Sequence, residues 1–210
     1  MNYWKYNHPA KNVFSWLLMM LVVAGAILLL NYSKDSLFWA LNQQHTYPGD
    51  LFFSYFTHVG DGLMMIGLGV VLMGLGKRRL GLLLIISFLF SGLIVQICKK
   101  GKPEPRPGRY FTEVSRIHKV RDQPLTGNNS FPSGHTTTAF AMFAMLALFT
   151  GSHILQLCYF LMALLVAYSR IYLGQHFFKD VYAGAILGYL CTLLIVWIFK
   201  NKELGGRLSN

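Results

Sequence analysis

Two histidines and one aspartate in this sequence have the types and spacing of groups that react with a substrate. His176 and Asp180 are four residues apart, so they share one face if this segment begins a helix. A carboxylate beside one imidazole nitrogen fixes the tautomer and leaves the other nitrogen free to attack. His135 opens a long apolar run and can protonate a leaving group and later deprotonate a water. This pattern predicts covalent catalysis with His176 as the nucleophile.

The residues near these three groups in the sequence are suited to binding a phosphate. Lys99, Arg106 and Arg170 are cations, and an arginine can hold a phosphate through two parallel hydrogen bonds. Gly134 lets backbone N–H groups approach an anion, and a helix that starts there adds its positive dipole end. Ser133 can donate its hydroxyl or cap that helix. Phosphoryl transfer depends mostly on positioning and electrostatic stabilisation, so these residues predict that chemistry.

The composition indicates that this chemistry belongs to a membrane protein. The chain is 54% hydrophobic and 13% charged, whereas about 25% of residues are charged in an average soluble chain. A formal charge of +11 suggests an anionic partner. We expect a lipid phosphate rather than nucleic acid, because most of the chain suits lipid. The 8 acidic residues are scattered and the three cysteines lack metal-ligand spacing, so we expect no metal, no cofactor and no disulfide framework.

Six apolar stretches separate along the chain, and a membrane-spanning helix needs about 20 such residues. We therefore expect an all-α fold, an integral membrane bundle of six transmembrane helices forming one domain over residues 1–210. A long basic loop at about 99–132 interrupts it, and residues 36–45 are too short to span and are expected in the interface. The six stretches lie at about 13–31, 52–76, 80–98, 134–150, 153–169 and 178–199.

Six crossings place all the candidate residues on one side of the membrane, because an odd number of helices precedes each group. With a cytoplasmic N-terminus this side is the outer face, so the active site would face the periplasm or exterior of the inner membrane. The first stretch lacks a small-residue cleavage site after it and is expected to be a retained signal anchor. More Lys and Arg then lie outside than inside, against the positive-inside rule. We keep this orientation because the outer excess lies in the predicted phosphate-binding segments, apart from Lys34.

The spacing of these groups resembles the type 2 phosphatidic acid phosphatase superfamily. Its signature has three parts, K-x6-RP, PSGH and SR-x5-H-x3-D, and every position is matched. The joint pattern is highly specific, although PSGH alone would be weak. The matching residues are Lys99 with Arg106 and Pro107, then 132–135, then Ser169, Arg170, His176 and Asp180.

The resemblance implies a role for each matching residue. It implies His176 as the nucleophile, Asp180 as the group that orients it and His135 as the general acid. It also implies hydrolysis of a lipid phosphate or diphosphate at the non-cytoplasmic face, without a metal. The phosphate binders that it implies are Lys99, Arg106, Ser133, Gly134 and Arg170.

The predicted activity leaves several alternatives open. Undecaprenyl diphosphate, phosphatidylglycerol phosphate, phosphatidate and lipid A phosphate are all candidate substrates, and the oligomeric state is undetermined. The phosphoryl group can also pass to another lipid, which would make the protein a phosphotransferase. A vanadate-binding haloperoxidase fits the same residues but not the six apolar stretches. A non-catalytic transporter or lipid-binding protein would need the cations but not both His135 and His176.

Two further groups of polar residues have two interpretations each. His58 and Asp61 are three residues apart near the outer end of the second stretch. They form either a functional pair or a structural hydrogen-bonding pair. A cluster in the long loop either is solvated or attracts an anionic headgroup; it comprises Arg116, His118, Lys119 and Arg121.

Overall fold

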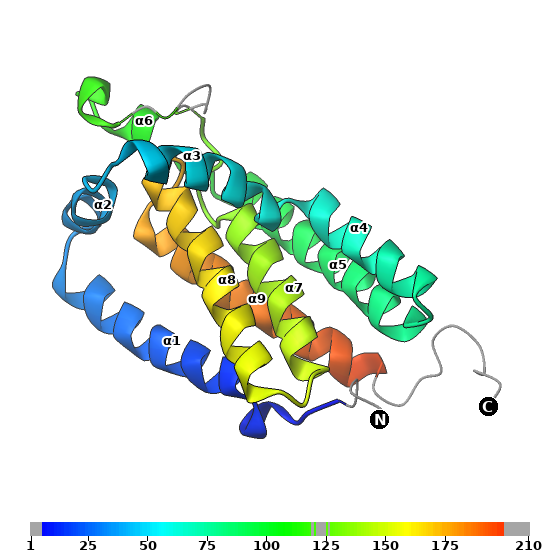
Figure 1. Ribbon diagram of the computed structural model, residues 1–210. Helices are drawn as coiled ribbons and strands as arrows, with labels where there is room; N and C mark the ends of the chain where they lie inside the picture. The colour runs from blue at the N-terminus through cyan, green and yellow to red at the C-terminus, as the bar shows by residue number, and fades with distance from the viewer. Residues whose placement is uncertain (1–5, 119, 121–124, 126, 200–210) are drawn as a thin grey trace.

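The computed structural model describes residues 6–118, 120, 125 and 127–199. All the secondary-structure elements within these residues are helices (Figure 1). The all-α prediction is confirmed for this part of the chain. Three short 3-10 turns lie at Pro9–Lys11, Thr57–Gly60 and Val114–Arg116. The α-helices are α1 (Val13–Asn31), α2 (Lys34–Asn42), α3 (Tyr47–Phe56), α4 (Gly62–Gly74), α5 (Arg78–Gly101), α6 (Pro107–Tyr110), α7 (Gly134–Leu148), α8 (His153–Tyr172) and α9 (Phe178–Phe199).

Each of the six apolar stretches is helical, but the prediction of six membrane spans is not confirmed. By length and composition, α1, α5, α8 and α9 can cross a membrane, and α3 with α4 makes a fifth candidate that is bent by 59°. The bend falls at Asp61, whose carboxylate accepts the backbone N–H of Leu63 and so starts α4 as a new helix. Helix α7 has 15 residues, about 22 Å at 1.5 Å per residue, which is less than the hydrocarbon thickness of about 30 Å.

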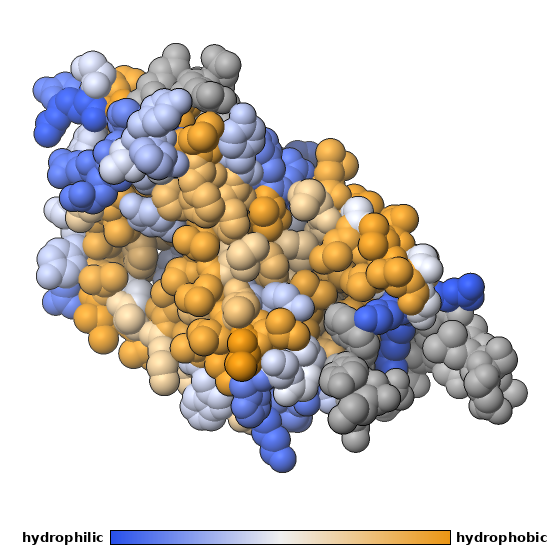
Figure 2. All heavy atoms as spheres, in the orientation of Figure 1, coloured by the Kyte–Doolittle hydropathy of each residue, from blue (hydrophilic) through white to orange (hydrophobic). Residues whose placement is uncertain are grey.

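The outer surface of the bundle is apolar, as expected of a multi-pass membrane protein. Large hydrophobic side chains point outward from several helices, among them Leu30 on α1, Leu63 on α4 and Trp197 on α9. Figure 2 shows hydrophobic residues across the middle of one face, with hydrophilic residues gathered near α2 and α6 and at the opposite edge. Exposing such a broad apolar surface to water is unfavourable, whereas contact with lipid chains is not.

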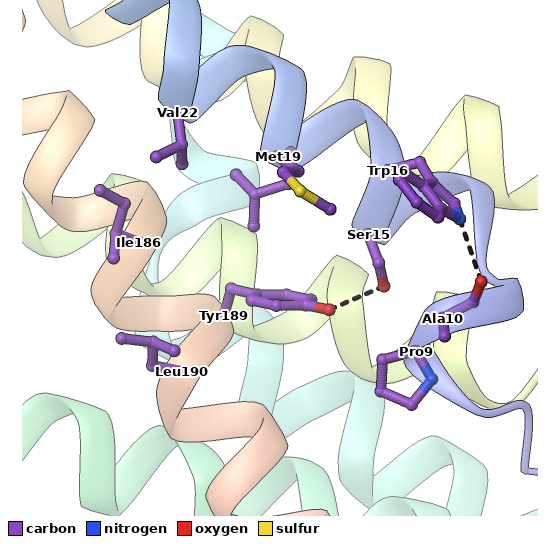
Figure 3. A pocket seen from close by; sticks show the side chains of 10 residues that line it. Pro9, Ala10, Ser15, Trp16, Met19, Val22, Ile186, Tyr189 and Leu190 are labelled. Carbon is purple, nitrogen blue, oxygen red and sulfur yellow. Dashed lines mark hydrogen bonds between the residues drawn. The ribbon is translucent and has the colours of Figure 1, made fainter. Parts of the chain in front are cut away.

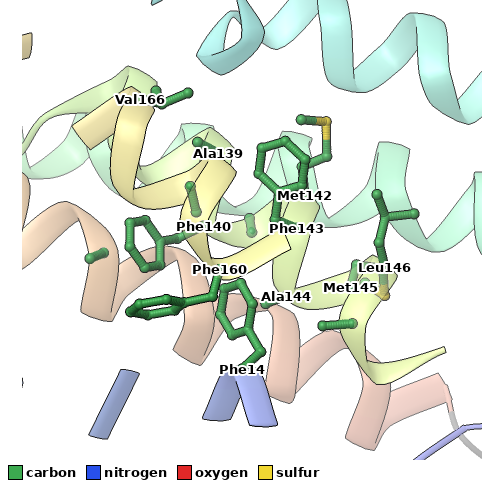
Figure 4. Packing of buried hydrophobic residues seen from close by; sticks show 14 of the residues in the cluster. Phe14, Ala139, Phe140, Met142, Phe143, Ala144, Met145, Leu146, Phe160 and Val166 are labelled. Carbon is green, nitrogen blue, oxygen red and sulfur yellow. The ribbon is translucent and has the colours of Figure 1, made fainter. Parts of the chain in front are cut away.

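Helix α7 is the centre of the bundle. Its residues from Thr136 to Leu148 are all buried, and it packs against α5, α8 and α9. Phe140 contacts the rings of Phe14 on α1 and Phe160 on α8 edge to face, with centroids 6.0 and 6.4 Å away (Figure 4). Because protein surrounds α7, this helix does not need to match the thickness of the bilayer. The same packing gives its first residues a rigid support.

Helices α7 and α9 approach each other backbone to backbone. A Cβ atom on Gly188 of α9 would lie only 2.3 Å from the carbonyl oxygen of Thr137 on α7. Glycine therefore permits the contact, as small residues commonly do between membrane helices. At the start of both helices, the Ser133 N–H donates to the Asp180 carbonyl oxygen over 3.0 Å. The first turns of α7 and α9 are thus held together.

A tight turn joins α8 to α9. Gly174 adopts a positive φ of 65°, a backbone conformation that ends helices and favours glycine. The backbone N–H groups of Gln175 and His176 both donate to the carbonyl oxygen of Arg170, over 3.0 and 3.2 Å. This turn brings His176 back against the end of α8. Figure 1 shows the C-terminal end of α8 and the starts of α7 and α9 toward the end of the bundle that carries α2 and α6.

Candidate active site

His176 and Asp180 lie side by side in the interior. Their side chains are 2% and 0% exposed, and His176 Nδ1 is 3.6 Å from Asp180 Oδ2. The same carboxylate oxygen accepts hydrogen bonds from the Ser130 hydroxyl over 2.6 Å and from the Phe177 N–H over 2.9 Å. These donors fix the carboxylate beside Nδ1. The two side chains that the sequence paired therefore lie next to each other, with Nδ1 as the ring nitrogen on the side of the carboxylate.

Ser130 is a site residue that the sequence did not reveal. Besides its bond to Asp180, its Oγ lies 3.5 Å from His176 Nδ1. An isolated β-bridge between Glu104 and Asn129 holds this part of the long loop, and the Ser130 N–H donates to the Glu104 carbonyl oxygen over 3.0 Å. No spacing rule marks such a residue, because its position depends on how the loop folds back.

Two arginines border the pair, and both are held by neutral side chains. Arg170 is 5% exposed, and its Nη1 donates to the hydroxyl of Thr57. Its Nε has no hydrogen-bond partner among the described residues. Arg106 donates from Nε to Asn129 Oδ1 over 3.0 Å and from Nη1 to Gln175 Oε1. Arg170 is buried and Arg106 is half-buried, and guanidinium groups in such places without a carboxylate partner favour binding of an anion.

The third cation, Lys99, lines a cavity of about 200 Å³ together with Gly134 and His135. A Cβ atom on Gly134 would lie 3.8 Å from Lys99 Nζ, so the absence of a side chain there leaves room beside the ammonium group. The wall that α5 contributes is partly apolar and includes Phe88 and Val95. The cavity thus has a polar end near Lys99 and His135 and an apolar side near Phe88 and Val95.

Electrostatic contacts connect this cavity with the histidine–aspartate pair. Burial lowers the pKa of His135, and His176, Arg170, Lys99 and His58 lie close enough for their charges to lower it further. Lys99 interacts in turn with both arginines and with Asp180. The structure therefore brings together the two histidines, the aspartate and the three cations that the sequence singled out.

Burial makes His176 a neutral imidazole. It lowers the pKa of His176 to about 4, although Asp180 acts in the opposite direction, and Arg170 and Arg106 lower this pKa further. At neutral pH the ring therefore keeps a free lone pair. A nucleophile needs such a lone pair.

The start of α7 offers further hydrogen-bond donors. Ser133 is fully buried at the position that precedes the helix, but its side chain makes no capping bond to the backbone of α7. Its Oγ instead accepts the hydroxyl of Thr136 over 2.9 Å. The first N–H groups of α7, from Gly134 onward, are therefore not satisfied by this side chain. Uncapped N–H groups at a helix start bind anions readily.

The described members of the two further groups of polar residues, the pair His58 and Asp61 and the loop cluster, do not act as units in the structure. Asp61 caps α4 and so has a structural role. His58 is exposed and interacts with His135. In the loop cluster, Arg116 pairs with Glu113 over 3.3 Å, and His118 contacts Asp50, as described further below. Lys119 and Arg121 lie outside the described residues.

A larger cavity of about 410 Å³ lies between α1 and α9 and contains none of the predicted site residues (Figure 3). Its lining is almost entirely apolar. The polar groups at its edge are engaged: the Tyr189 hydroxyl donates to Ser15 Oγ over 2.7 Å, and Trp16 Nε1 donates to the Ala10 carbonyl oxygen over 3.0 Å. This cavity lacks the groups that chemistry would require.

Comparison with known proteins gives a consistent family assignment. The model of the PAP2 superfamily matches residues 80–204, a range that contains every predicted site residue. A lipid A 1-phosphatase of Rhizobium johnstonii is 30% identical over 133 residues, which are 62% of this chain and 52% of that protein. An undecaprenyl-diphosphatase of Sulfolobus acidocaldarius is 31% identical over 121 residues, 58% and 56% of the two chains. The chain thus spans about half the length of these curated relatives.

Solved structures show the same similarity. The crystal structure of Aquifex aeolicus LpxE superposes with a TM-score of 0.72 at 27% sequence identity. The match covers 80% of this chain and 97% of that one.

Proposed function

Because the chain belongs to the PAP2 superfamily, we propose that it is an integral membrane phosphatase that hydrolyses a phosphate monoester or diphosphate of a lipid. One observation carries the proposal. The buried pair of His176 and Asp180 lies within electrostatic reach of His135 and of cations that form no ion pair with any carboxylate in the described part of the chain. A transporter would need such cations to bind a headgroup, but it would not need a nucleophile with a fixed tautomer and a second histidine.

The geometry supports a two-step mechanism. Nε2 of His176 attacks the phosphorus atom while Asp180 stabilises the positive charge that develops on the ring. The bond between phosphorus and the lipid oxygen breaks, and His135 donates a proton to that oxygen. Water then attacks the phosphohistidine, His135 takes its proton, and inorganic phosphate leaves. A bound phosphate anion favours the protonated form of His135 that the first step requires.

The cations and the start of α7 stabilise the transferred group. Lys99, Arg106 and Arg170 face the negative charge on the equatorial oxygens, and the N–H groups from Gly134 onward add donors. Ser133 contributes its hydroxyl. No step of this mechanism requires a metal.

The substrate is a lipid whose phosphate enters the polar end of the cavity. Its tail would lie along the apolar side near Phe88 and Val95 on α5. Relatives are named for lipid A 1-phosphate and undecaprenyl diphosphate, and phosphatidylglycerol phosphate and phosphatidate present the same reacting group. We propose that the site lies at the outer face of the inner membrane, because three candidate spans, α1, the bent pair α3–α4 and α5, lead to Lys99 from an N-terminus that is predicted to be cytoplasmic.

Phosphate release from a panel of these four lipids tests the proposal. The purified full chain is assayed in excess chelator, with His176→Ala as the test variant and the exposed His153→Ala as its control. We expect release without added metal, inhibition by vanadate, and loss of release only in His176→Ala. Product analysis with an acceptor lipid separates hydrolysis from phosphotransfer. Dependence on magnesium would contradict the mechanism, and no release from any lipid would favour transport.

A further inference from the structure

A second cluster of titratable side chains lies outside the proposed active site. His45 follows α2, Asp50 lies in the first turn of α3, and His118 lies in the loop between α6 and α7. His118 Nε2 is 2.8 Å from Asp50 Oδ2, and His45 Nδ1 is 3.5 Å from Asp50 Oδ1. The two imidazole rings are stacked, with centroids 4.0 Å apart. One carboxylate is thus shared by two histidines from separate segments.

This arrangement leaves His45 with unsatisfied nitrogens. Its side chain is 11% exposed, and neither ring nitrogen has a hydrogen-bond partner of acceptable geometry in the described part of the chain. A buried polar group without a partner costs about 1–3 kcal/mol. A neutral imidazole with an unused lone pair is the form that binds a metal ion.

The ligand atoms are close enough to converge on one ion. Two imidazole nitrogens and one carboxylate oxygen are a ligand set typical of zinc with an open fourth position. The candidate atoms of these three residues lie within 4.8 Å of one another. In a tetrahedral site with bonds of about 2.0–2.2 Å, ligand atoms are about 3.4 Å apart. Small side-chain rotations therefore suffice, and His118, at 43% exposure, is free to make them.

A neighbouring tyrosine orients the carboxylate. The Tyr172 hydroxyl donates to Asp50 Oδ1 over 2.7 Å, and its ring lies 4.4 Å from that of His45. Metal ligands are commonly held in this way by a hydrogen bond from a second layer of residues. Tyr172 is itself buried at the end of α8, so this support is rigid.

We propose that His45, Asp50 and His118 bind a divalent transition-metal ion of the zinc class, with water in the fourth position. None of the three belongs to the family signature, so this site is separate from the phosphoryl chemistry. The ion links two segments that are 68 residues apart in the chain. It thereby ties the long loop, which also carries Arg106 and Ser130, to α3. Its role is to strengthen a contact that the hydrogen bond between His118 and Asp50 already makes without the ion, so phosphate release does not require it.

Zinc titration of the full-length, tag-free protein tests this site. The protein is freed of metal with a chelator, dialysed and titrated by calorimetry, with magnesium as the control ion. We expect one zinc ion per chain and no magnesium binding, because magnesium prefers oxygen ligands. His45→Gln and His118→Gln should each weaken binding at least about 100-fold, and Tyr172→Phe about tenfold. His153→Gln and His176→Gln should bind as the wild type does.

Labelling of the unmutated protein covers the case in which a variant does not fold. Diethyl pyrocarbonate modifies free imidazoles, and mass spectrometry locates the modified residues. Zinc should protect His118 and leave the exposed His153 unprotected. The proposal is overturned if the wild type binds no zinc, if zinc leaves the labelling of His118 unchanged, or if binding is lost in His176→Gln but kept in His118→Gln.

Discussion

The backbone N–H of Ser133 donates a hydrogen bond to the backbone carbonyl of Asp180 over 3.0 Å. This bond joins the first turn of α7 to the first turn of α9 and so sets His135 in register with His176. Because backbone groups form it, replacing the side chains of His135, His176 or Asp180 removes neither its donor nor its acceptor. Substitutions at the histidines and the aspartate therefore test chemistry more than folding.

Asp180→Asn should abolish most activity. An amide can turn its NH₂ group toward His176 Nδ1, and this favours the tautomer that carries its proton on Nε2 and cannot attack from there. The substitution also removes the negative charge that stabilises the imidazolium. By analogy with the aspartate of a serine protease triad, we expect kcat to fall about 10²- to 10⁴-fold. Steady-state kinetics on a folded variant provide the measurement. Wild-type kcat in Asp180→Asn would contradict the orienting role.

Ser130→Ala should have a smaller effect of the same kind. It removes one donor from Asp180 Oδ2 and leaves the donor from the Phe177 N–H in place. A hydrogen bond to a charged group contributes about 1.5–3 kcal/mol, so we expect a loss of about 10- to 100-fold in kcat with little change in KM. The exposed Ser36→Ala is the matched control. If both serine variants are equally active, Ser130 does not position the carboxylate.

His135→Ala should discriminate between substrates. The leaving group of a diphosphate is a better one than the alcohol of a monoester, so it depends less on protonation by His135. The variant should therefore lose more kcat/KM on a lipid monoester than on a lipid diphosphate. The ratio of the two values, compared with the wild-type ratio, is the readout. An equal loss on both substrates would argue against His135 as the general acid.

The pKa of His176 predicts a pH-dependent contribution to stability. The unfolded histidine binds a proton near pH 6.5, whereas the folded one does so only near pH 4. Between these values the unfolded state binds more protons, so the folded protein loses stability as the pH falls. The loss is complete below about pH 4 and corresponds to roughly 3 kcal/mol. Thermal unfolding at several pH values should show that His176→Gln loses less stability than the wild type as the pH falls. An equal loss of stability in both proteins would contradict this contribution of His176.

Local sequence patterns were sufficient to predict that the apolar stretches are helical and to single out residues that the fold brings close together. The apolar stretches became helices because a continuous apolar run in lipid must satisfy its backbone hydrogen bonds internally. His176 and Asp180 are four residues apart across the start of α9, and the turn after α8 holds His176 two residues before that helix. The family signature anticipated the cations, whose contacts run between α5, α8 and the long loop.

The features that the sequence did not predict depend on tertiary packing. An apolar helix surrounded by protein has the same composition as one surrounded by lipid, so the interior position of α7 could not be recognised. The bend at Asp61 depends on a capping bond that competes with a continuous helix. Ser130 and His118 come from the long loop, and their partners Asp180 and Asp50 are 50 and 68 residues away in the chain. The orientation in the membrane stays a prediction.

The most direct test of the central claim is to trap the covalent intermediate. The protein is mixed with a lipid labelled with ³²P at its reacting phosphate and quenched in alkali, where phosphohistidine is stable. We expect labelled protein, with the phosphate mapped to His176 by mass spectrometry and absent from His176→Gln. An active enzyme that carries no label at any quench time, or a label on another residue that persists in His176→Gln, would contradict the account.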